Sequence, residues 1–160
     1  MALNKTRLLI FIVFSLLAMT VSAQVHQTDQ IEVELVSETI NVVPGQTTWL
    51  AIRLDPIDHW HTYWKMGGDS GEPTTLTEWQ APEGTQIGEL QWPAPHWLPF
   101  YETDLVNFGY EQEVVLPVAV TLPADFSADQ VELSTLAYWN CLLYTSPSPR
   151  DRQKSRMAAC

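Results

Sequence analysis

The run WHTYWKMGGDSGEPT, residues 60–74, places two tryptophans, a tyrosine and a histidine within five positions and then breaks into a glycine-rich turn. Alternating aromatic and polar side chains are typical of a β-strand whose two faces meet different surroundings. The glycines at positions 67, 68 and 71 supply backbone conformations that other residues rarely adopt. The run therefore predicts a strand followed by a tight turn.

Further strands are predicted on both sides of this run. Alternation predicts strands at residues 31–38 and 48–54, with these apolar side chains facing inward: Ile31, Val33, Leu35, Leu50, Ile52 and Leu54. Residues 113–122 and 131–139 are also β-prone, and Pro117 indicates a sheet edge or a bulge. No long segment has helical periodicity. We expect an all-β, immunoglobulin-like antiparallel β-sandwich, with a small β-barrel as the competing architecture.

The first 23 residues have the pattern of a secretory signal peptide. Lys5 and Arg7 precede an apolar run from Leu8 to Met19, and small residues suited to cleavage follow it. The apolar run is shorter than the roughly 20 residues that a membrane-spanning helix needs. We expect residues 1–23 to be removed on export, and an uncleaved membrane anchor is the alternative.

The charge of the mature region limits its partners. Residues 24–140 contain only Arg53 and Lys65 as basic residues against eighteen acids, a net charge of −16, whereas the whole chain has −11. Such a surface repels nucleic acids and anionic membranes. Neither class of partner is expected.

The last twenty residues, 141–160, differ from the rest in composition. They hold four of the eight basic residues and both cysteines, Cys141 and Cys160. CLLYTSPSPRD, residues 141–151, resembles the translation of a sequencing-library adapter, and a disordered basic tail is the alternative. We therefore assign residues 24–140, which contain no cysteine and so no disulfide, to one β-sandwich domain, and residues 141–160 to an artefactual or disordered tail.

Two motifs inside the opening run suggest chemistry. GDSG, residues 68–71, is found around nucleophilic serines, but residues 24–140 are about half a trypsin-like fold, so we expect a turn in which Asp69 and Ser70 bond their own backbone. His59 and His61 would share one face of a strand and could bind one metal with Asp58, Asp69 or His96. Histidines that bond locally are the favoured interpretation.

Aromatic residues gather in QWPAPHWLPFY, residues 91–101. Trp92, Trp97, Phe100 and Tyr101 could line a groove whose rings stack on the faces of a sugar. The favoured alternative is that these large side chains fill the core of a small sandwich and cover its proline-rich loops.

Three blocks, in order, resemble the N-terminal periplasmic domain of DsbD-type thiol:disulfide interchange proteins. They are residues 60–74, LQWPAP at 90–95 and GYEQEVVLPV at 109–118, and the resemblance covers about residues 31–138. Met66 and Gly67 stand where that family usually has asparagine and proline. The resemblance implies an immunoglobulin-like sandwich in the periplasm, belonging to a parent protein of the inner membrane with a role in cytochrome c biogenesis.

In that family the domain passes electrons from thioredoxin-like and membrane domains of the parent protein to periplasmic disulfide proteins, without a cofactor. It uses two cysteines placed just after the strand that matches residues 133–139. Cys141 stands near the first of these positions and is our candidate catalytic residue, although it also begins the adapter-like text. The next cysteine is Cys160, so the pair is expected to be incomplete, and this chain inactive as a reductase by itself.

The same resemblance implies a cap over the cysteines at residues 99–110. Phe100, Tyr101 and Phe108 are the candidates to shield a thiol there, and packing on the end of the sandwich is the alternative. We further expect a C-terminally truncated sandwich with an unpaired strand edge. A non-enzymatic immunoglobulin-like module that binds a carbohydrate, protein or metal is the alternative function.

Overall fold

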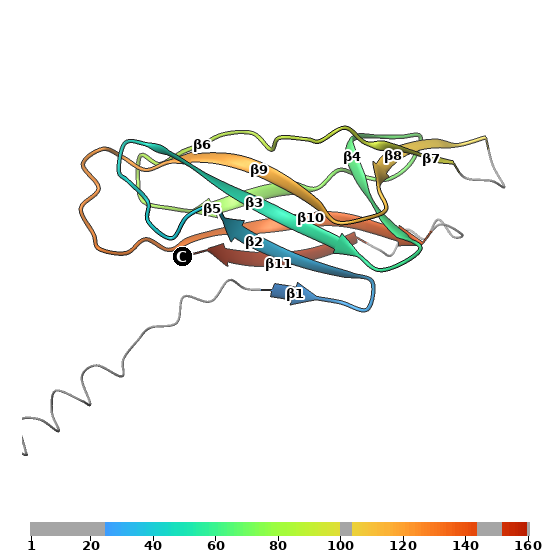
Figure 1. The fold of residues 1–160 in the computed structure, drawn as a ribbon, viewed down its shortest axis with the longest axis horizontal. Helices are drawn as coiled ribbons and strands as arrows, with labels where there is room; N and C mark the ends of the chain where they lie inside the picture. Colours follow the sequence, from blue (N-terminus) through green and yellow to red (C-terminus); the bar gives the residue numbers. More distant parts are fainter. Residues whose placement is uncertain (1–24, 100–103, 144–151, 160) are drawn as a thin grey trace, which may run out of the picture.

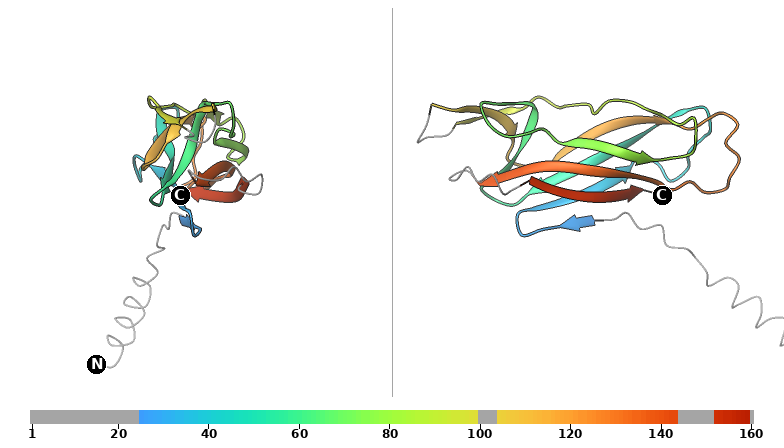
Figure 2. Two further views of the ribbon diagram at one scale, coloured as in Figure 1. Left: turned by 90° about the vertical axis from the view of Figure 1, so that its right-hand side faces the viewer. Right: turned by 180° about the vertical axis from the view of Figure 1, so that it is seen from behind.

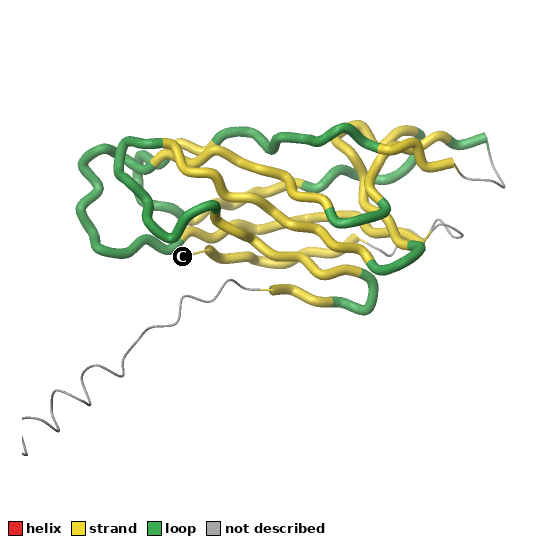
Figure 3. Tube along the Cα trace, in the orientation of Figure 1, coloured by secondary structure: helices red, strands yellow, loops and turns green. Residues whose placement is uncertain are grey.

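The computed structural model describes residues 25–99, 104–143 and 152–159, and these residues form strands and loops without a helix (Figure 3). The predicted signal peptide lies outside the described residues. Among the described residues, no helix is long and apolar enough to span a membrane. The strands are β1 Val25–Gln27, β2 Ile31–Ser37, β3 Thr47–Pro56, β4 Trp60–Gly68, β5 Thr75–Gln80, β6 Gln86–Ile87, β7 His96–Pro99, β8 Val106–Tyr110, β9 Val114–Thr121, β10 Leu133–Leu143 and β11 Arg152–Ala159.

The strands form two antiparallel sheets. The first has the order β1-β2-β3-β9-β6, and the second has the order β11-β10-β4-β8-β7, with β5 also paired to β10. In Figure 1 the first sheet is nearer the viewer, and a half-turn of the molecule brings β5, β10 and β11 to the front (Figure 2). The predicted all-β, immunoglobulin-like sandwich is therefore confirmed, and the barrel is not.

The core lies between the sheets and follows the predicted alternation. Ile31, Val33 and Leu35 of β2 are all fully buried, as are Ile52 and Leu54 of β3. Each such side chain contributes about 1.5–3 kcal/mol of burial free energy relative to exposure. The second sheet supplies the opposite wall, through side chains that share one face of β10: Leu133, Ala137, Trp139 and Cys141.

Pro117 lies in β9 with Ala51 of β3 as its partner. Its carbonyl oxygen accepts a hydrogen bond from the Gln91 N–H, 2.7 Å away, on the side of β9 that faces away from β3. The nitrogen of a residue points to the same side of a strand as its carbonyl, so the missing N–H of this proline faces the sheet edge. β9 lies between β3 and β6 in the sheet, but β6 pairs with it only at Val120 and Thr121, so on this side no described strand pairs with β9 at Pro117.

The glycine turn after β4 folds back over Tyr63. Gly71 has φ +84°, and a Cβ atom there would lie 2.3 Å from the Tyr63 ring. The predicted hydrogen bonds of this turn are wrong: Asp69 and Ser70 bond to β8 rather than to their own backbone. The Asp69 carboxylate accepts from Val106 N–H at 2.8 Å, and the Asn107 side-chain oxygen accepts from Ser70 N–H at 2.9 Å. The partners are 37 positions away along the chain, which a local pattern does not reveal.

The end of the chain also differs from expectation. β10 continues through Cys141 to Leu143, past the predicted boundary at Asn140, without a break in the strand. Residues 152–159, which we assigned to a tail, form β11 and pair with residues 133–140 of β10. The edge of β10 is therefore covered along these residues, and β11 is the outermost strand on this side of the sheet. The origin of residues 141–160 stays a prediction.

Candidate functional site

Cys141, the candidate catalytic residue, lies inside the sandwich. Its side chain is fully buried and belongs to the core cluster with Ala137 and Trp139. Residues two apart in a strand share a face, so these three side chains all point toward the first sheet. The thiol is therefore part of the core in this conformation and is not accessible to a partner.

A short turn before β2 contacts the thiol. The Cys141 Sγ lies 4.0 Å from the backbone carbonyl oxygen of Gln30, a distance at which a thiol donates a weak hydrogen bond. The same oxygen accepts from the Ile57 N–H at 3.0 Å. The Thr28 hydroxyl oxygen accepts from the backbone N–H groups of Gln30 and Ile31, each at 3.2 Å. Thr28 thus fixes the turn that lies against Cys141.

The strands predicted from the sequence begin at Ile31, but β1 precedes it and pairs with β2 across this turn. The sequence contained one signal for this turn, namely Thr28. A threonine hydroxyl commonly accepts hydrogen bonds from backbone N–H groups two or three positions later in the chain, and this stabilises a turn.

The strand beside Cys141 contributes a buried threonine. Thr62 of β4 is the register partner of Cys141, and on its other side Thr62 pairs with Tyr110 of β8. Thr62 is fully buried, and its hydroxyl has no hydrogen-bond partner among the described residues. The Tyr110 hydroxyl donates to the Pro93 carbonyl at 2.8 Å, and burial raises the pKa of Tyr110 to about 12. Neutral groups therefore border the thiol on this side.

His61 and Cys141 lie on opposite faces of the second sheet. His61 precedes Thr62, so its side chain points to the opposite face of the sheet from that of Cys141. Its ring makes an edge contact with Tyr63, with centroids 5.0 Å apart, and desolvation lowers its pKa to about 4. His61 is a neutral core histidine at pH 7.

The paired-histidine metal site is wrong. His59 is exposed in the turn before β4 at φ +73°, whereas His61 is fully buried in the strand. The motif predicted that the two side chains share one strand face, and they do not. Within the described residues, no group of three or more potential ligands is placed to hold a metal ion.

Ser70, the serine of the GDSG motif, has a structural role. The Ser70 hydroxyl donates to the Asn107 side-chain oxygen at 3.2 Å, and Asn107 is fully buried. This contact joins the glycine turn to β8. It gives Ser70 the structural role that we favoured over that of a nucleophile.

Of the three cap candidates, Phe100 and Tyr101 lie outside the described residues. Phe108 of β8 is 36% exposed and pairs across the hairpin with Trp97 of β7. β4 lies between β8 and β10, and two strand spacings amount to about 10 Å. Phe108 thus lies two strands from Cys141, whereas the Gln30 carbonyl contacts it directly.

The aromatic groove predicted around Trp92 and Trp97 is not assembled as expected. Trp92 lines a cavity of about 640 Å³ together with Trp79, Leu76 and Lys65. Trp97 is 60% exposed on β7 and does not line that cavity. The two tryptophans of the predicted groove therefore lie in different surroundings.

The family of the chain follows from comparison of its sequence. The sequence model of the family "Thiol:disulfide interchange protein DsbD, N-terminal" matches residues 20–141, which is more than half of the chain. The chain belongs to this family. The match ends on Cys141, so the buried cysteine of β10 is inside the family's domain.

Among solved structures, the chain is similar to the N-terminal periplasmic domain of ScsB from Proteus mirabilis. The TM-score is 0.60 at 15% sequence identity, and the match covers 88% of this chain and 51% of that one. The chain thus spans about half the length of the ScsB structure, and at this identity the likeness concerns the fold. A yeast GGA1 GAE domain matches with a TM-score of 0.44 and 11% identity, over 86% of this chain and 96% of that one. No curated protein sequence matches significantly.

Proposed function

We propose that the chain is a periplasmic thiol–disulfide interchange domain that passes electrons from a membrane reductase to periplasmic disulfide proteins. The observation that carries this proposal is the family match, which extends from residue 20 to Cys141. The export pattern of residues 1–23 supports a location outside the cytoplasm. The expected partners are thioredoxin-like and membrane domains of a parent protein on one side and periplasmic disulfide proteins on the other.

The chemistry requires Cys141 as a thiolate. Its sulfur attacks one sulfur of a partner's disulfide, forms a mixed disulfide, and releases the other partner sulfur as a thiolate. A second cysteine thiolate then attacks the mixed disulfide and leaves the partner fully reduced. The two cysteines need Cα atoms within about 7 Å of each other. Cys160, the other cysteine of this chain, lies outside the described residues.

Because Cys141 is buried, the proposed reaction also requires that a partner's sulfur gain access to its thiol. A partner's sulfur can approach Sγ only after the Gln30 carbonyl moves away from it. The turn is short, and opening it breaks the hydrogen bonds that the Thr28 hydroxyl and the Gln30 carbonyl oxygen accept. We propose that displacement of this turn exposes the thiol.

Glutathione disulfide tests the exchange reaction on the full chain. The Cys160→Ser variant isolates Cys141, and Cys141→Ser is its matched control. We expect the first variant to acquire one glutathione by mass spectrometry, reversibly with dithiothreitol, and the second to acquire it at Cys160 alone. A Cys141 thiol that stays unmodified under conditions that modify Cys160, even after Thr28→Val, would contradict the proposal.

The cavity beside Trp79 and Trp92 favours one other function, a carbohydrate-binding module. Two indoles and the polar groups of Lys65 and Glu89 border it. Tryptophan fluorescence titrated with cello-, chito- and malto-oligosaccharides tests this function. Saturable quenching that Trp92→Phe removes and Trp97→Phe retains supports it, and no response at millimolar sugar excludes it.

A further inference from the structure

The outward face of the first sheet carries an apolar hollow that the interchange function does not use. The hollow has a volume of about 400 Å³ and lies over β2, β3 and β9, and it also meets the loop at Gln91. Its apolar lining consists of Val36, Trp49, Leu50, Ala51, Val115 and Pro117. Cys141 points into the core from the opposite sheet, so this hollow is a separate feature.

The shape of the hollow follows from residue size. Ala51 has Val36 as its partner on β2 and Pro117 as its partner on β9, so a small side chain sits in the middle of a row of larger ones. Trp49 and Val115 are each 39% exposed beside it. Large apolar side chains that stay partly exposed around a concave floor are typical of a surface that receives another side chain.

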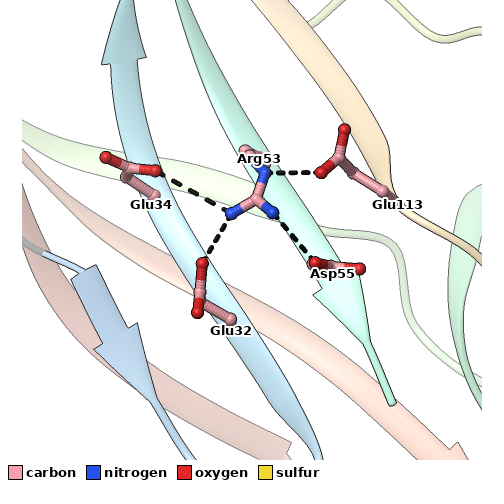
Figure 4. Close-up of polar contacts among 5 residues, drawn as sticks. All are labelled: Glu32, Glu34, Arg53, Asp55 and Glu113. Carbon is pink, nitrogen blue, oxygen red and sulfur yellow. Dashed lines mark hydrogen bonds and ion pairs between the residues drawn. The ribbon is translucent and has the colours of Figure 1, made fainter. Parts of the chain in front are cut away.

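A cluster of carboxylates adjoins the hollow on the same face. Arg53 follows Ala51 by two positions, and its guanidinium donates to Glu32 at 2.6 Å, Asp55 at 2.9 Å and Glu113 at 2.7 Å (Figure 4). Glu34 lies 3.9 Å from the same guanidinium. Four carboxylates around one cation leave a net charge of −3, and these side chains are between 22% and 50% exposed.

This negative charge indicates which kind of partner can bind in the hollow. A second copy of the chain would bring its own net negative cluster, and residues 24–140 as a whole carry −16, so self-association through this face is disfavoured. A cationic partner is attracted by the same negative charge. Ala51 and Arg53 are about 7 Å apart along the strand, and side chains two apart in any extended peptide have the same spacing.

We propose that this face binds an extended segment of a partner protein in which an apolar side chain is followed, two positions on, by lysine or arginine. The apolar side chain occupies the hollow over Ala51, between Trp49 and Val115. The basic side chain lies over the carboxylates of Glu32 and Glu113, which Arg53 holds in place. The site tethers a partner at a distance from the thiol.

A synthetic peptide tests the proposal without knowledge of the natural partner. The probe is acetyl-Ser-Leu-Ser-Lys-Ser-Lys-Ser-amide, titrated into the ¹⁵N-labelled full chain and followed by backbone amide shifts. We expect saturable shifts at the amides of Trp49, Ala51, Arg53 and Val115. Serine in place of the leucine should weaken binding about tenfold, because it removes one buried side chain. Glutamates in place of the lysines should abolish it.

Two protein variants complete the test, each checked by circular dichroism for folding. Ala51→Leu fills the hollow and should weaken binding at least tenfold, whereas Glu113→Gln removes one charge and should weaken it about threefold. Equal affinity of the leucine and serine peptides would overturn the proposal, and so would unchanged binding to Ala51→Leu. Concentration-dependent shifts of the same amides without peptide would assign the face to a second copy instead.

Discussion

The Cys141 Sγ and the Gln30 carbonyl oxygen lie 4.0 Å apart although 111 positions separate the two residues in the chain. This contact joins the start of the first sheet to the end of β10 in the second. Because the thiol is fully buried there, its reactivity depends on whether this contact opens. A chemical probe of one sulfur therefore reports on the packing of both ends of the domain.

The first prediction concerns that opening. In the Cys160→Ser background, Cys141 should react with Ellman's reagent roughly a hundredfold more slowly in the native chain than in urea, which corresponds to a local opening free energy of about 3 kcal/mol. Thr28→Val should raise the native rate about fivefold, because the valine cannot accept hydrogen bonds from Gln30 and Ile31. Thr39→Val, which alters a turn outside this contact, is the matched control and should leave the rate unchanged.

The second prediction concerns the glycine turn over Tyr63. Gly71→Ala should lower the free energy of unfolding by about 2–4 kcal/mol, because the new methyl group meets the Tyr63 ring at 2.3 Å and the backbone has a positive φ. Gly88→Ala is the control, since its methyl group would lie 3.4 Å from the nearest atom, in ordinary contact. Urea denaturation followed by fluorescence measures both, and equal effects of the two substitutions would count against the packing described for the turn.

The third prediction concerns pH. Desolvation lowers the pKa of His61 to about 4 in the folded chain, against 6.5 for the unfolded residue. The unfolded state therefore binds a proton first, so the contribution of His61 to stability is complete above pH 6.5 and is lost as the pH falls toward 4. The loss should reach up to about 3 kcal/mol. His61→Leu should flatten this part of the stability curve, measured by urea unfolding between pH 4 and 7, whereas His59→Leu should leave it in place.

The fourth prediction concerns the carboxylates around Arg53. The hydrogen bonds that the Arg53 guanidinium donates to Glu32 and Glu113 raise its pKa above the usual value, so it stays charged at any pH at which the protein is studied. Arg53→Met should lower the free energy of unfolding by about 1 kcal/mol at low salt, because it leaves four carboxylates to repel one another. Adding 0.5 M NaCl should reduce that loss. A loss that does not change with salt would mean that the side chain acts by packing instead.

The sandwich was predictable because its strands alternate with a period of two. Ile31, Val33 and Leu35 are separated by acidic residues, so only one face of β2 can be buried, and the structure buries it. Contacts between distant residues could not be read in this way. The Asp69–Val106 and Cys141–Gln30 contacts depend on how two sheets stack, which is decided by the whole core.

The histidine motif failed for a local reason. A shared strand face requires both residues to be inside the strand, but the chain turns at His59, whose φ is +73°. Alternation alone does not say at which residue a strand begins. The start of β4 one residue later, at Trp60, is enough to separate an exposed imidazole from a buried one.

The contact between Gln30 and Cys141 also orders events during synthesis. β2 and β3 can pair soon after they emerge, since they are neighbours in the chain, but the thiol is covered only when β10 has reached β4. Until that assembly is complete, the sulfur is exposed to any oxidant that surrounds the chain. For that interval, the speed of β10 docking protects the cysteine from premature oxidation.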